Sequence, residues 1–157
     1  MKPAHLFCSV ALLASLCLAT PSRADSASDR AAVEATGAAI HAAFAAGNVA
    51  EIMRYHRPDV RKALSFKNVE VGGNAVAAGL QDSLRRFHVE FVENNVENLL
   101  IAGDTAIEQT VFAIKATPLA GGQPSIFRGR TMVVYVRYKD SPTGWASIRE
   151  LIQPASN

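Results

Sequence analysis

The chain has 157 residues, of which 49% are hydrophobic and 19% are charged. It contains 16 Lys and Arg residues against 14 Asp and Glu residues. Two of the basic residues, Lys2 and Arg23, lie in an N-terminal segment that we expect to be removed, so the remaining protein is near neutral. A balanced charge argues against a nucleic acid or an anionic membrane as the partner.

The first 24 residues have the pattern of a secretory signal peptide. Lys2 supplies a positive charge, residues 6–19 form an apolar run, and Ser22 and Ala24 put small residues before the expected cleavage site. The apolar run is shorter than the roughly 20 residues that a membrane-spanning helix needs. The sequence predicts cleavage after residue 24, export to the periplasm or the medium, no stable membrane anchor, and one domain over residues 25–157.

Cysteine and histidine usage argues against thiol and metal chemistry. Both cysteines, Cys8 and Cys17, lie in the expected signal peptide, so the exported chain would carry no thiol and no disulfide. The histidines that follow, His41, His56 and His88, stand isolated and form no paired metal-ligand motif. We expect no metal and no cofactor.

Two helices are expected at the start of the exported chain. Residues 28–46 carry apolar side chains at helical spacing, and Gly47 ends that helix. Asn48 followed by Glu51 has the pattern of a capping box, which predicts a second helix that Pro58 ends. The basic cluster from Arg54 to Lys62 is expected to form a solvated surface.

The next segment changes from an extended stretch to a third helix. Residues 60–66 predict a short strand or an extended arm before the turn at Gly72 and Gly73. Asn74 is expected to cap the third helix, and His88 is expected to close it. Apolar residues recur every three or four positions along this helix, at Val76, Leu80, Leu84 and Phe87.

The C-terminal half has the composition of a sheet. β-Branched and aromatic residues occur in runs that turn residues interrupt, which predicts four antiparallel strands at residues 95–102, 105–117, 125–139 and 145–153. The acidic, asparagine-rich stretch from Glu90 is expected to be a solvated edge or loop. Helices followed by a meander of strands indicate an α+β fold.

Three stretches resemble a known superfamily. They are residues 43–52 (AFAAGNVAEI), residues 101–106 (IAGDTA), and the Arg128–Arg130 stretch with the later Gly144–Trp145 pair. In these motifs the chain resembles the nuclear transport factor 2-like, or ketosteroid isomerase-like, superfamily, in its small SnoaL-like and calcium/calmodulin-kinase-association-like branches. The resemblance implies a cone: three helices pack on the concave face of a curved antiparallel sheet, a pocket opens at one end, and dimers form through the sheet's outer face.

The resemblance also allows a test of the steroid isomerase site. With Gly47 as the anchor, the family's tyrosine donor falls on Ile40, its aspartate base on Leu64, and its protonated aspartate near Val134. None of these residues can transfer a proton or donate a hydrogen bond from its side chain. The catalytic residues of steroid isomerases are therefore absent from these positions.

The leading hypothesis is an exported module that binds a small apolar or amphipathic ligand inside the cone and forms a homodimer. A histidine at position 56 would lie in the pocket under this hypothesis, whereas the alternative is a partly exposed histidine at a helix end. The ligand-binding residues expected from the resemblance are Ile40, His41, Phe44, Met53, His56 and Leu64.

Two other functions remain open. An isomerase, cyclase or dehydratase would need a titrating group in the cavity, for which His56, Glu108 and Glu150 are the candidate catalytic residues. Strand alternation does not determine whether Glu108 faces inward. A protein-interaction module would instead use the outer sheet, with residues such as Arg137 and Tyr138 as its working surface.

Overall fold

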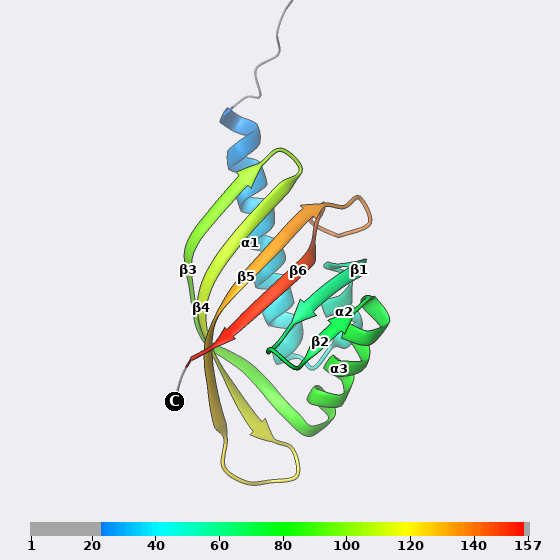
Figure 1. The fold of residues 1–157 in the computed structure, drawn as a ribbon, viewed down its shortest axis with the longest axis vertical. Coiled ribbons are helices and arrows are strands. Elements are labelled where there is room, and N and C mark those ends of the chain that lie inside the picture. The colour runs from blue at the N-terminus through cyan, green and yellow to red at the C-terminus, as the bar shows by residue number, and fades with distance from the viewer. Residues whose placement is uncertain (1–22, 156–157) are drawn as a thin grey trace, which may run out of the picture.

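The structure, a computed structural model, describes residues 23–155 (Figure 1). The expected signal peptide therefore lies almost entirely outside the described residues. The helices are α1 (Arg23–Ala45), α2 (Val49–Met53) and α3 (Gly73–Arg86). The strands are β1 (His56–Ala63), β2 (Val69–Val71), β3 (Phe87–Ala102), β4 (Thr105–Pro118), β5 (Ser125–Arg137) and β6 (Trp145–Pro154).

All six strands form one curved, open sheet in the order β2-β1-β6-β5-β4-β3. Neighbouring strands run antiparallel except at the junction of β1 and β6, which is parallel. The first strand of the chain is thus inserted beside the last one. Helix α1 crosses the face of the sheet and packs on β3 and β6, and α3 packs on β1, β2 and β3 (Figure 1). The expected α+β cone is confirmed.

The short helix α2 begins where the capping box predicts. The side chain of Asn48 accepts a hydrogen bond from the backbone N–H of Glu51 at 3.0 Å, which satisfies one donor of the first turn. The helix ends before Pro58, which lies inside β1. The pairing of β1 with β6 shifts register between His56 and Arg61, and such an irregularity tolerates a proline in a strand.

The start of α3 differs from the prediction. The residue before its first turn is Gly72 with φ of 87°, and no side chain caps the helix. Asn74 lies inside the helix because glycine takes this left-handed conformation more readily than asparagine.

Strand β3 begins eight residues earlier than the sequence predicts. The chain passes from α3 directly into β3 at Phe87, so His88 lies in the strand and does not close the helix. β3 is an edge strand that pairs only with β4. Its exposed acidic and asparagine residues protect that edge from pairing with another chain.

The core between α1 and the sheet fixes the inner face of the sheet. Val33 of α1 is fully buried against Trp145 of β6 and Leu99 of β3. Tyr135 and Val133 of β5 belong to the same cluster, so the odd-numbered residues of this part of β5 face inward. On β4 the pairing register puts the even-numbered residues on that face.

Candidate functional site

A cavity of about 530 Å³ lies between the helices and the inner face of the sheet. Helix α1 contributes Gly37, Ile40, His41 and Phe44, which are three or four residues apart and so share one helical face. The opposite wall comes from α3, and the floor comes from β1 and from β3 to β6. The cavity is apolar at one end and polar in its centre.

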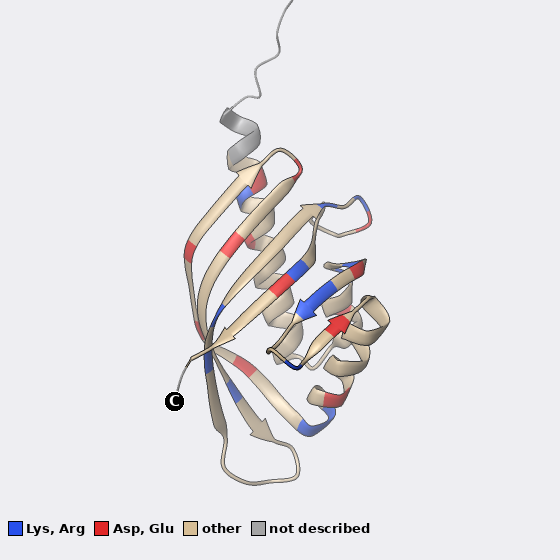
Figure 2. Cartoon of the chain, in the orientation of Figure 1, with Lys and Arg blue, Asp and Glu red and all other residues tan. Residues whose placement is uncertain are grey.

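The polar centre consists of two rows of residues that the strand register places side by side. One row passes from His56 on β1 through Ser147 on β6 to Tyr135 on β5. The other row crosses five strands in the order Glu70, Lys62, Glu150, Val133 and Glu108. Figure 2 shows acidic positions on β2 and β6 on either side of the basic positions of β1.

A buried ion pair lies in the second row. Nζ of Lys62 is 2.6 Å from Oε2 of Glu150, and the two side chains are only 7% and 16% exposed. Burial raises the pKa of Glu150, but the Lys62 ammonium and then His56 outweigh it, so the pKa of this carboxyl is below its usual value. A buried charge without its partner is strongly destabilising, so each side chain requires the other.

Glu70 adds a second carboxyl beside Lys62. Burial raises the pKa of Glu70, and the nearby Glu150 acts in the same direction, against the attraction of Lys62. The carboxyl fits because position 79 of α3 has no side chain: a Cβ at Gly79 would overlap the Glu70 carboxylate. The floor therefore contains one ammonium and two carboxyls in adjacent positions.

His56 is anchored at one ring nitrogen. Its Nδ1 lies 2.9 Å from the backbone oxygen of Ile52, which can only accept, so Nδ1 carries the proton. Burial, and after it the charge of Lys62, lowers the pKa of His56 to about 4, although the Ile52 carbonyl and Glu150 act in the opposite direction. At neutral pH the ring is uncharged, and Nε2 is left as a hydrogen-bond acceptor.

Glu108 and Tyr135 form a second polar pair. The Thr110 hydroxyl donates a hydrogen bond to Glu108 at 3.3 Å, and the Tyr135 hydroxyl interacts with the same carboxyl. Burial nonetheless raises the pKa of Glu108, and it raises the pKa of Tyr135 well above its usual value. Desolvation in the cavity therefore makes this carboxyl a weaker acid than an exposed glutamate.

Ser147 lies between these groups with an unused hydroxyl. The residue is 1% exposed and lines the cavity, and its Oγ has no hydrogen-bond partner among the described residues. Leaving a buried hydroxyl unpaired costs about 1 to 3 kcal/mol. Such a group marks a place where a polar atom of a ligand can be recognised.

Aromatic rings line the apolar end of the cavity. The His41 ring stacks on Phe91 with centroids 3.9 Å apart and planes 24° apart, and burial lowers the pKa of His41. Phe91 also contacts Phe44 edge-on at 5.7 Å and lies 6.3 Å from Phe112, which leads to Phe127 at 5.8 Å. Rings at these distances pack favourably on one another and can accept a flat apolar molecule.

The expected ligand-binding residues are largely brought together. Five of them line the cavity: Ile40, His41, Phe44, His56 and Leu64. Met53 is not among the lining residues, because its methyl group packs beside Gly73 at the start of α3. His56 is buried, so the alternative of a partly exposed histidine is wrong.

Both candidate acids line the cavity, and the structure shows which residues of their strands face inward. Glu108 and Glu150 lie in the same row on the inner face, separated by Val133. Val134, the position matched to the family's protonated aspartate, lies on the outer face of the sheet. The inward residues nearest to it are Val133 and Tyr135.

Sequence reasoning missed several polar residues of the floor, including Lys62, Glu70, Tyr135 and Ser147. Lys62 was expected on a solvated basic surface, yet it is buried. The sequence pattern contains a usable signal, because Lys62 alternates with the exposed Arg61 in a strand. Without the parallel pairing of β1 and β6, however, nothing indicates that Lys62 faces Glu150.

Metal ligands do not converge in the part of the chain that the structure describes. Among these residues there is no group of three or more His, Cys, Asp or Glu side chains placed to hold a metal ion. The neighbouring carboxyls of the floor are engaged with Lys62, Tyr135 and Thr110.

Comparison with known proteins supports the fold. No protein-family model and no curated protein matches the chain. Among solved structures, it resembles a proposed scytalone dehydratase from Novosphingobium aromaticivorans, with a TM-score of 0.75, 12% identity, and coverage of 86% of this chain and 89% of that one. A ketosteroid isomerase-like protein from Erwinia carotovora atroseptica has a TM-score of 0.67 at 16% identity, with 81% and 96% covered.

A third solved structure names the fold. It is a proposed dehydratase of the nuclear transport factor 2-like family from Streptomyces avermitilis, with a TM-score of 0.72, 17% identity, and coverage of 83% of this chain and 99% of that one. The chain has the nuclear transport factor 2-like fold. The solved structures with this fold include a ketosteroid isomerase-like protein and two proposed dehydratases. At these identities the likeness concerns the fold alone.

The low pKa of His56 predicts a specific loss of stability in acid. Between about pH 6.5 and 4 the unfolded chain binds a proton that the folded His56 excludes, so the free energy of unfolding falls as the pH is lowered through this window. The effect is of the order of 3 kcal/mol for a fully buried ring. Urea denaturation at several pH values should show a smaller acid loss for His56→Phe than for the wild type.

The matched control is His88→Phe, since the His88 side chain is 45% exposed. This variant should follow the wild-type pH dependence. Equal acid losses in wild type and His56→Phe would contradict the assignment of a neutral, buried His56.

Proposed function

We propose that the protein binds a neutral, amphipathic small molecule in the cavity, with the apolar body of the ligand against the aromatic rings and its polar group on the floor. The observation that carries this proposal is the cavity itself: about 530 Å³ enclosed by α1, α3 and the sheet, with Phe44, Phe91 and Phe112 at one end and hydrogen-bonding groups in the centre. Apolar walls with a few converging polar groups are typical of small-molecule sites.

The charges of the floor favour a neutral ligand over an anion. Lys62 is neutralised by Glu150 at 2.6 Å, and Glu70 occupies its other side. Because His56 is uncharged near neutral pH, and because Arg86 at the cavity is paired with Asp82 at 2.7 Å, none of these lining groups is free to pair with a carboxylate or phosphate. An anionic head group would lose its hydration without an ionic partner.

Binding is tested with a neutral fluorescent probe, N-phenyl-1-naphthylamine. Leu84 of α3 lines the cavity, so Leu84→Trp should fill part of it and weaken probe binding at least about tenfold. Leu100 is 55% exposed and lies outside the lining, so the control variant Leu100→Trp should bind the probe as the wild type does. Absence of probe binding to the wild type, or equal binding by both variants, would contradict a ligand site in the cavity.

Acid–base catalysis is the second candidate function, and the anchored His56 favours it. Its Nε2 is an unprotonated base at neutral pH, and Glu108, whose pKa is raised by burial, lies with Tyr135 on the same floor. An enzyme of the isomerase or dehydratase type would lose turnover in His56→Ala and Glu108→Gln while retaining the ligand. Unchanged turnover in both variants would exclude this mechanism.

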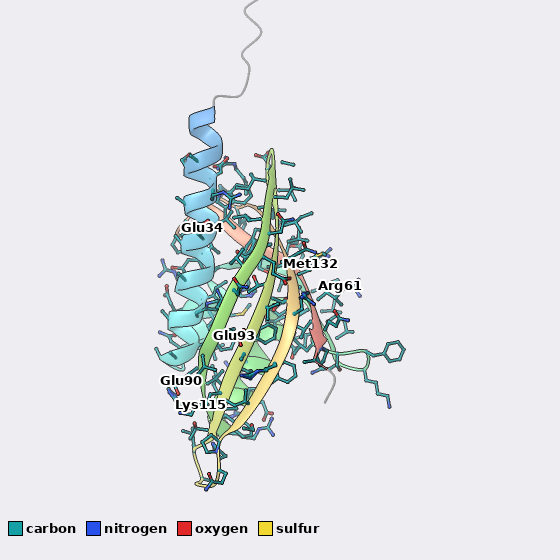
Figure 3. The ribbon with its side chains drawn as sticks, turned by 90° about the vertical axis from the view of Figure 1, so that its left-hand side faces the viewer. Glu34, Arg61, Glu90, Glu93, Lys115 and Met132 are labelled. Carbon is teal, nitrogen blue, oxygen red and sulfur yellow. The ribbon has the colours of Figure 1, made fainter. Side chains whose placement is uncertain are left out.

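We further propose that two copies pair through the outer face of the sheet. Apolar side chains are exposed there on neighbouring strands, as at Val69, Met132 and Leu151, which the register places in one row with Ala63. Figure 3 shows Met132 and Arg61 on the side of the sheet away from α1. An exposed apolar patch of this kind is typical of an interaction surface.

Pairing is tested by sedimentation velocity. Met132→Glu should convert a dimer to a monomer, whereas Phe66→Glu should not, because Phe66 is exposed at the tip of the β1–β2 turn and lies outside this face. A monomeric wild type would contradict the proposal. The surface around Arg137 is a weaker candidate for binding a partner, because Arg137 is already engaged with Asp29 at 2.6 Å and stacks over Trp145.

We also propose that the protein is exported. The signal-like pattern of residues 1–24 supports it. Among the described residues, no helix is long and apolar enough to cross a membrane. N-terminal sequencing of the protein recovered from an exporting host should give a start at Asp25, and recovery of the uncleaved chain in the cytoplasm would contradict export.

A further inference from the structure

Two polar groups on the floor of the cavity have hydrogen-bonding capacity that the protein does not use. The Oγ of Ser147 has no partner among the described residues. Nδ1 of His56 is held by the Ile52 oxygen, and no bond within the described chain engages Nε2. Both residues are buried, with 1% and 5% exposure, and both line the cavity.

The strand pairing places these two groups together. His56 and Ser147 are direct partners in the parallel ladder of β1 and β6, and the N–H of Ser147 donates to the Tyr55 oxygen at 2.9 Å. Adjacent strands lie roughly 4.8 Å apart, so the two side chains are neighbours on the floor of the cavity. On its other side, Ser147 is paired with Tyr135, whose hydroxyl interacts with Glu108.

We propose that His56 and Ser147 form a subsite for a hydroxyl group carried by an aromatic ring of the ligand. This inference rests on the proposed function and specifies the ligand class. A hydroxyl oxygen can accept from Ser147 and at the same time donate its proton to Nε2 of His56, which satisfies both groups with one atom. The aromatic residues Phe91 and Phe112 receive the ring that carries it.

Other head groups match the pair less well. A ketone or ether oxygen accepts from Ser147 but has no proton for His56. A carboxylate has the same deficiency and also meets Glu150 and Glu70 in the adjacent row. The requirement for a donor and an acceptor on one atom therefore selects a hydroxyl.

The test compares 2-naphthol with 2-methoxynaphthalene by isothermal titration calorimetry on the purified protein. In a purely apolar cavity the more apolar methyl ether would bind at least as tightly as the naphthol. The subsite predicts the reverse order, with 2-naphthol binding about tenfold tighter. The preference should disappear in Ser147→Ala and in His56→Phe.

Thr36→Val is the matched control. Thr36 carries a buried hydroxyl that lies outside the cavity lining and already donates to the Ala32 oxygen at 2.8 Å, so its loss should leave the preference for 2-naphthol unchanged. Equal binding of the two compounds by the wild type, or a preference that survives in Ser147→Ala and His56→Phe, overturns the subsite while leaving the cavity as a ligand site. Failure of both compounds to bind overturns the subsite together with the proposed function.

Discussion

The buried ion pair between Lys62 and Glu150 is the constraint on which the rest of the site depends. It joins the first strand of the chain to the last, at the only parallel junction among the described strands. Two charges are tolerated inside because each neutralises the other, and neither could remain there alone. This junction also brings His56 beside Ser147, so the position of the polar floor follows from where β1 enters the sheet.

On the floor of the cavity, the charged side chains have partners within the protein, whereas two polar groups have none among the described residues. Lys62 is occupied by Glu150, and Glu108 is occupied by Tyr135 and Thr110. These pairs fix the floor, while the anchored ring of His56 and the hydroxyl of Ser147 are left to meet a ligand. A neutral molecule with an apolar body suits such a cavity because the aromatic wall offers apolar contact area and the polar floor orients the ligand. The same groups would also serve acid–base chemistry.

The sequence predicts the fold better than the site. Helical spacing in residues 28–46, the capping box at Asn48 and the runs of β-branched residues are local signals, and the elements they predict are present. The start of β3 was missed because asparagine and glutamate in an edge strand have the composition of a loop. Side chains of an edge strand face water, so their amino-acid composition does not indicate whether the strand pairs with a neighbour.

The site depends on contacts between strands that are far apart in the sequence. His56, Leu64 and Phe44 were found through the resemblance, which carries the shape of the cone. Lys62 and Ser147 were missed because nothing in the local sequence distinguishes them from an exposed lysine and an ordinary strand serine. Their role depends on the residues that the strand pairing places beside them. The pairing of β1 with β6 spans about 90 residues and is not visible in any local pattern.

The most direct test of the account is native mass spectrometry of the protein purified from its own host, followed by denaturation to release whatever it carries. The account predicts one small, neutral, hydroxyl-bearing aromatic molecule per chain, lost on unfolding. A carboxylate- or phosphate-bearing molecule in the cavity, or protein that is consistently empty, would contradict it.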